Sequence, residues 1–102
     1  FTYVDDIIAG LVAVIDRRKE CIGEVFNIGS DTNTTTGEGI AIVEKLLNRK
    51  ARIKTLPPRR GDQYHTYAQI GKAKSILGYA PRTSLKDGLS KQVTWYKNSL
   101  MK

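Results

Sequence analysis

The sequence LPPRRGDQYHTY, residues 56–67, divides this chain into an N-terminal and a C-terminal half and gathers its most varied side chains. Pro57 and Pro58 hold the backbone extended and supply no amide donors, so the two arginines that follow leave the preceding segment at a fixed angle. Gly61 then allows a tight turn. This pattern predicts an ordered loop over residues 57–69, with a preceding strand at 51–56, where apolar and polar residues alternate.

The loop offers chemistry suited to a phosphate-containing ligand. Guanidinium groups bind phosphate oxygens in pairs, a carboxylate accepts hydrogen bonds from hydroxyl groups, and phenol or imidazole rings stack on a base or sugar. A nucleotide or nucleotide sugar would meet all three. A solvated basic turn between a strand and a helix explains the composition equally well, and that alternative stays open.

Upstream of the loop, the sequence predicts two helices and one strand. The first helix, at about residues 5–18, begins at Asp5 as a capping residue, and its apolar residues cover most of its circumference. We therefore expect it to be buried on more than one side. A short strand follows at 24–28. The second helix spans about 36–48, because Thr35 and Glu38 have the spacing of a capping box.

Downstream of the loop, two further helices are expected. One spans about 70–77, where Gly78 is placed as the C-terminal stop. The other spans about 84–100, where Ser84 and Asp87 have the spacing of a capping box. Four helices with few short strands predict an α/β or α+β-like fold. Two strands cannot form a self-sufficient sheet, so we expect a fragment of a larger fold.

The length, composition and net charge of the chain limit the class of protein. The chain has 102 residues, of which 40% are hydrophobic and 26% charged, and its formal charge is +7. Its basic residues are scattered along the chain, with clusters in four separate places, which argues against nucleic-acid binding. A small basic nucleic-acid-binding module is the alternative from another class. No apolar run approaches the length of a membrane span. The single Cys21 is compatible with a cytoplasmic location.

The chain lacks the residues that common catalytic sites require. His65 is the only histidine and Cys21 the only cysteine, so the sequence has no cluster of soft metal ligands. No glycine-rich phosphate loop, dinucleotide fingerprint or nucleophile elbow is present. We expect no catalytic residue and no metal site. The sequence also begins inside an apolar pattern, at Phe1, which again suggests a fragment.

Four stretches resemble one family in order along the chain. These are FTYVDDI at 1–7, EVFNIGS at 24–30, RRGD at 59–62 and KAKSILGYAP at 72–81. Together they resemble the C-terminal part of extended short-chain dehydrogenases, in particular NAD-dependent nucleotide-sugar epimerases and dehydratases of the UDP-glucose or UDP-glucuronate 4-epimerase kind. The resemblance implies a C-terminal substrate-binding lobe whose parent carries NAD on an N-terminal Rossmann domain with a Tyr-x-x-x-Lys pair. Neither feature occurs in this chain.

The resemblance also implies roles for individual residues. Arg59 matches a diphosphate-binding arginine, and Asp62 matches a carboxylate that meets ribose hydroxyls. Thr66 falls near the hexose and Thr36 near the nucleotide in related enzymes. In the parent, NAD takes a hydride from C4 of the sugar and returns it to the other face, whereas this chain alone should be inactive and should bind no cofactor.

The resemblance leaves other enzyme activities open. The lobe of a nucleotide-sugar dehydratase, reductase or decarboxylase has a similar outline. The expected partners are the nucleotide sugar, the missing Rossmann domain and, through an exposed apolar helix, a second copy of the chain. We expect at least one of Ile7, Ile8, Val12 and Phe26 to be exposed in this chain alone.

Overall fold

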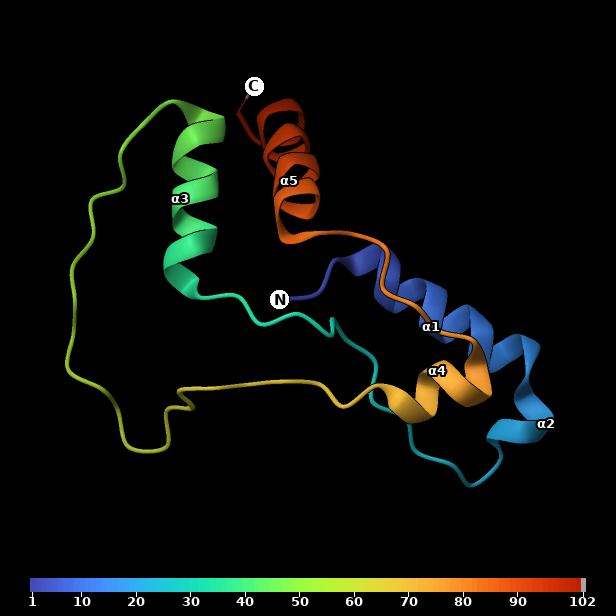
Figure 1. The fold of residues 1–102 in the computed structure, drawn as a ribbon. Helices are drawn as coiled ribbons and strands as arrows, with labels where there is room; N and C mark the ends of the chain where they lie inside the picture. Colours follow the sequence, from blue (N-terminus) through green and yellow to red (C-terminus); the bar gives the residue numbers. More distant parts are fainter. Residues whose placement is uncertain (102) are drawn as a thin grey trace.

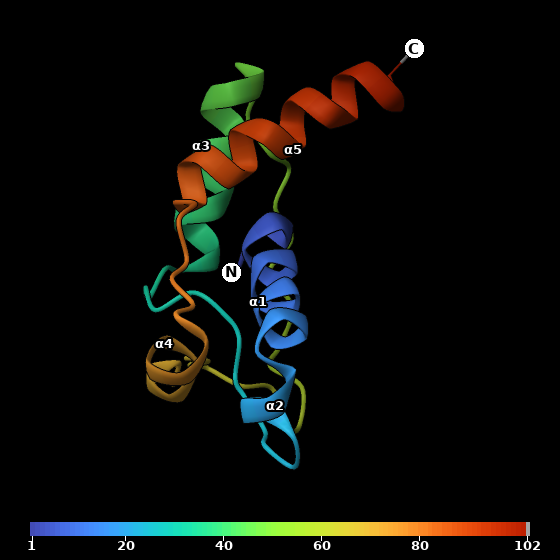
Figure 2. The same ribbon diagram turned by 90° about the vertical axis from the view of Figure 1, so that its right-hand side faces the viewer.

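The structure, a computed structural model, describes residues 1–101, which form five helices joined by extended segments (Figure 1). The helices pack as two groups. In one, α1 and the short α2 lie beside α4; in the other, α3 and α5 cross each other (Figure 2). The bounds are α1 Val4–Asp16, α2 Arg18–Cys21, α3 Thr36–Leu47, α4 Gly71–Leu77 and α5 Leu85–Ser99.

Local signals in the sequence fix most helix ends. At the start of α3, Thr35 N donates to Glu38 Oε2 at 2.5 Å and Glu38 N donates to Thr35 Oγ1 at 3.1 Å, so both halves of the capping box are present. At the start of α5, Ser84 Oγ accepts from the backbone N–H of Asp87 at 3.1 Å. Gly78 ends α4 with a φ of 64°, a left-handed conformation that glycine adopts without steric cost.

The expectation that Asp5 caps the first helix is wrong. The helix α1 begins at Val4, and Tyr3 occupies the N-cap without a side-chain hydrogen bond. Asp6, in the first turn, is buried instead and accepts from the backbone N–H groups of Arg82 and Thr83, each at 3.1 Å. Its carboxylate therefore ties α1 to the connection between α4 and α5.

The expected strands at 24–28 and 51–56 are not strands in residues 1–101. Both segments run without helix or ladder, and the backbone groups of residues 25–28 and 51–56 form no backbone–backbone hydrogen bond within the described chain. A strand is defined by its partner, and these two segments do not pair with each other. The α/β assignment is therefore not confirmed; the described chain is helical.

The buried core is small and lies where α4 meets α1. Only four hydrophobic residues of the described chain are buried, namely Ile70, Ala73, Leu77 and Tyr79. Ala13 and Val14 of α1 and the half-buried Phe26 and Ile28 pack against them. Gly10 allows Ile28 to approach α1 closely, because a Cβ added at Gly10 would lie 3.0 Å from the Ile28 side chain.

The chain is more open than a compact domain of its length. Its radius of gyration is 16.8 Å, whereas about 13 Å is typical of 100 residues. Its accessible surface is 8598 Å², whereas a compact monomer of this mass exposes about 5800 Å². The long segment between α3 and α4 swings away from both helix groups (Figure 1). Much surface that a compact domain would bury is therefore exposed.

Helix α1 is apolar on both faces, as its pattern predicts, but only one face is covered. The opposite face carries an exposed apolar stripe whose members recur at helical spacing: Val4, Ile8, Leu11, Val12 and Ile15. Ile8 and Val12 are 50% and 48% exposed, whereas Ile7 and Phe26 are half-buried. None of the helices in residues 1–101 combines the length and the hydropathy needed to cross a membrane.

Candidate functional site

A cavity of about 550 Å³ lies between three segments that are distant in sequence. Residues 1–2, residues 26–30 with Thr32, and residues 66–69 form its walls. None of these residues carries a charged side chain. Hydroxyl and amide groups from Thr2, Asn27, Ser30 and Thr66 share the lining with aromatic rings, which suits an uncharged, hydroxylated ligand group.

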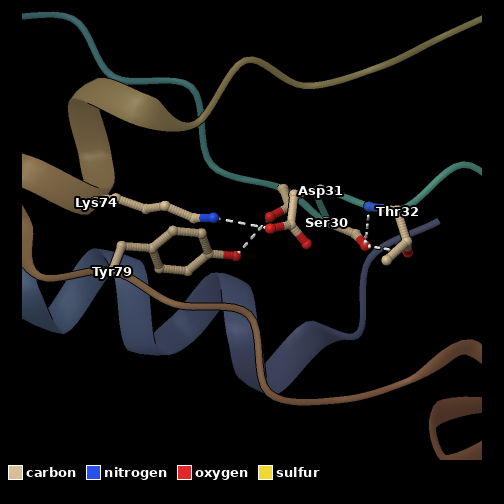
Figure 3. A network of polar contacts seen from close by, with 6 residues as sticks. Ser30, Asp31, Thr32, Lys74 and Tyr79 are labelled. Carbon is tan, nitrogen blue, oxygen red and sulfur yellow. Dashed lines mark hydrogen bonds and ion pairs between the residues drawn. The ribbon is translucent and has the colours of Figure 1, made fainter.

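The turn at residues 29–32 forms one wall and is held by side chains from elsewhere (Figure 3). The hydroxyl of Tyr79 donates to the carbonyl oxygen of Gly29 at 2.9 Å in a buried hydrogen bond. Lys74 Nζ of α4 pairs with Asp31 Oδ2 at 2.8 Å. Three separate groups thus fix the turn, because Ser30 N also donates to Thr2 Oγ1 at 3.0 Å.

The pKa shifts of Tyr79 and Asp31 both favour the protonation states in which these contacts form. Burial raises the pKa of the Tyr79 phenol, and the nearby carboxylates of Asp6 and Asp31 act in the same direction. The hydrogen bond from Lys74 lowers the pKa of Asp31. At neutral pH the phenol therefore remains a donor and the carboxylate remains an anion.

Gly29 brings two walls of the cavity into direct contact. A Cβ added at Gly29 would lie 2.9 Å from Cβ of Ala68 and 3.6 Å from Oγ1 of Thr2. Real Cβ atoms do not approach a carbon that closely, so any larger residue here would push residues 66–69 away. The width of the cavity therefore depends on this glycine.

Arg59 and Asp62 form a self-closed turn on the exposed loop. The backbone N–H of Arg59 donates to Asp62 Oδ2 at 2.8 Å, and the guanidinium lies 3.4 Å from Asp62 Oδ1. The backbone N–H of Asp62 returns a bond of 3.1 Å to the carbonyl oxygen of Arg59, and Gly61 adopts a φ of 92° between them. The Arg59 side chain is 88% exposed, so the ion pair competes with water and is easily exchanged.

The structure does not bring the four expected site residues into one cavity. Thr66 lines the cavity, whereas Arg59 and Asp62 face each other on the loop outside it. Thr36 is the exposed first residue of α3 and is not part of the lining. No group of three or more possible metal ligands occurs within residues 1–101.

Sequence reasoning assigned no role to the polar residues of the other two walls. Thr2, Ser30 and Thr32 reach the cavity only because the N-terminal segment, the turn and residues 66–69 converge. The signal in the sequence was the cluster GSDTN at 29–33, a polar turn directly after an apolar segment.

Known proteins similar to this chain include nucleotide-sugar epimerases. UDP-glucuronate 4-epimerase 5 of Arabidopsis thaliana is 36% identical over 94% of this chain, which spans 25% of that protein. An uncharacterized UDP-glucose epimerase of Bacillus subtilis is 36% identical over 93% of this chain and is matched over 30% of its own length. No family model matches the chain.

The fold shows the same similarity. UDP-glucuronic acid 4-epimerase from Bacillus cereus, in a mutant form crystallised with a fluorinated UDP-glucuronic acid and NAD, has a TM-score of 0.87 and 38% identity. The match covers 96% of this chain and 31% of that protein. The family resemblance is thus confirmed: the chain is a relative of the UDP-sugar 4-epimerases. The chain spans between a quarter and a third of the length of the UDP-glucuronate 4-epimerases that it matches.

Proposed function

We propose that this chain is the substrate-binding part of an NAD-dependent UDP-sugar 4-epimerase. The observation that carries the proposal is the match to the Bacillus cereus enzyme over 96% of this chain at a TM-score of 0.87. The cavity lining supports it, because uncharged hydroxyl groups beside aromatic rings suit a sugar. The part played by this chain is to position the substrate for a reaction that other residues carry out.

Arg59 and Asp62 would change partners when the nucleotide sugar binds. A diphosphate offers the Arg59 guanidinium two acceptor oxygens in place of the single contact of 3.4 Å that it makes with Asp62 Oδ1. Asp62 Oδ1 is then free to accept from a ribose hydroxyl, while Oδ2 keeps its bond to the backbone N–H of Arg59. The turn therefore holds both groups ready without a costly rearrangement. Thr66 would meet the hexose and Thr36 the nucleotide.

NAD, which supplies hydride transfer in such enzymes, is assigned to no residue of this chain. The sequence has no glycine-rich loop for the NAD pyrophosphate and no tyrosine followed four residues later by a lysine. We place both features in a Rossmann domain outside residues 1–102. We also propose a cytoplasmic location.

The test uses a chimera in which this chain replaces the matched part of the Bacillus cereus epimerase. Calorimetry gives its affinity for UDP-glucuronic acid. Arg59→Ala should weaken binding by roughly 2 kcal/mol, the worth of a charge-assisted contact, which is about 30-fold in Kd. Arg60→Ala is the matched control, because Arg60 forms no ion pair within residues 1–101.

Two results would contradict the proposal. One is an Arg59→Ala chimera with unchanged affinity and reduced turnover. The other is steep, salt-dependent binding of a short oligonucleotide by the chain, which would favour a nucleic-acid-binding module. If the chimera does not fold, the same variants are titrated with UDP in the chain alone and followed by nuclear magnetic resonance.

A further inference from the structure

We propose that Lys74 and Tyr79 are positioning residues that hold the turn at residues 29–32 in the shape needed to bind the substrate. The inference rests on the proposed function, because it assigns that turn to the nucleotide-sugar site. Neither residue lines the cavity. Each acts through the turn, whose Ser30 and Thr32 line the cavity. Tyr79 bonds to Gly29 O and Lys74 to the Asp31 carboxylate, so these two residues are the anchors of the turn.

The polar side chains of the turn have different partners: two line the cavity and one pairs with α4 (Figure 3). Ser30 and Thr32 line the cavity, and their hydroxyl oxygens lie 2.8 Å apart, with Thr32 N donating to Ser30 Oγ at 3.2 Å. Asp31, between them, does not line the cavity and pairs with Lys74. Because Asp31 lies between Ser30 and Thr32, the contact at its carboxylate restricts the backbone that carries the two hydroxyl groups.

The anchors differ in kind and come from a single structural unit. Lys74 lies on α4, and Tyr79 follows that helix directly after its Gly78 stop. Leu77 and Tyr79 are each only 4% exposed, so this unit belongs to the buried core. The phenol of Tyr79 donates to Gly29 O from within that core, whereas Lys74 reaches Asp31 across the surface with 47% of its side chain exposed. The turn is therefore fixed to the most buried part of the chain.

The ion pair contributes little to global stability, because both partners are partly exposed. Its effect is on the conformation of the turn. When the competent shape of a site is only partly populated, the apparent affinity falls by that fraction. Loss of one anchor should therefore reduce affinity by up to about fivefold, the factor that one net hydrogen bond supplies.

The first experiment measures how often the turn opens in this chain, without any ligand. Hydrogen exchange at the amides of Ser30 and Thr32 should become about fivefold faster in Lys74→Met and in Tyr79→Phe. Lys74→Arg keeps the charge and should restore the slow rate. Lys50→Met is the matched control, because Lys50 pairs with Glu44 at 2.9 Å on α3, away from the cavity lining. Unchanged exchange in both anchor variants would overturn the inference.

The second experiment measures KM and kcat of the chimera with UDP-glucuronic acid as substrate. Lys74→Met and Tyr79→Phe should raise KM by up to about fivefold and leave kcat unchanged, because they alter only the placement of the turn. Faster exchange with unchanged KM would overturn the positioning role, while the Arg59→Ala result would still support the proposed function. No affinity in the unsubstituted chimera would refute the proposed function and the positioning role with it.

Discussion

Asp6 provides the sharpest test of how this chain is held together. It is 6% exposed and accepts two hydrogen bonds, both of 3.1 Å, from the backbone N–H groups of Arg82 and Thr83. Hydrogen bonds to a charged group are worth about 1.5 kcal/mol each, so Asp6→Ala should cost about 3 kcal/mol. Asp6→Asn keeps one acceptor oxygen and should cost about half as much.

The neighbouring Asp5 is the matched control. Both carboxylates lie in the first turn of α1, where each interacts favourably with the helix dipole by about 0.5 kcal/mol. Asp5 is exposed and has no hydrogen-bond partner among residues 1–101, so Asp5→Ala should lose only that dipole contribution. The difference between the two alanine variants therefore isolates the two hydrogen bonds.

Urea denaturation followed by circular dichroism gives the free energy of unfolding for each variant. Hydrogen exchange at the amides of Arg82 and Thr83 reports the contact directly. If Asp6→Ala costs no more than Asp5→Ala, the carboxylate does not tie α1 to the connection between α4 and α5, and the reasoning is refuted.

Two further predictions concern the cavity and the ion pairs. Gly29→Ala should weaken UDP-glucuronic acid binding in the chimera more than tenfold, because its Cβ would lie 2.9 Å from Ala68 Cβ; calorimetry measures this, and unchanged affinity would show that the contact does not set the cavity width. The folded chain should also lose stability in acid. Lys74 lowers the pKa of Asp31 below its ordinary 3.8, and the Ala51 N–H lowers that of Glu44 below 4.5. Both contributions are present above these values and are lost as the pH falls through the lower folded pKa. Urea titrations between neutral pH and pH ~3 should show this loss, and equal stability at both ends would contradict it.

Helix ends were predictable because their causes are local. The capping box of Thr35 and Glu38, the glycine stop at Gly78 and the Ser84 cap each depend on residues within four positions of one another. The expected strand at 51–56 failed because strand formation depends on a partner that sequence alternation does not specify. The Asp5 cap was wrong because α1 begins at Val4, which places Asp5 inside the first turn. The contact of Asp6 with Arg82 was not predictable from the spacing of residues either.

The site was only partly predictable. The loop sequence indicated Arg59 and Asp62 as ligand-binding groups, but it did not indicate that they pair with each other in the structure. The cavity places Thr2 and Ser30 beside Thr66 through contacts that span much of the chain, and the spacing of residues does not reveal such convergence. Thr36 was assigned through the family resemblance alone, and the role of all four residues stays a proposal.

The stripe of Val4, Ile8, Leu11, Val12 and Ile15 on α1 has a consequence for the protein in the cell. Exposed apolar stripes at helical spacing are what chaperones hold and what aggregates bury. If residues 1–102 were produced without a covering surface, we expect quality-control proteases to keep their abundance low. Yield on co-expression with candidate partners would then report directly which polypeptide covers this helix.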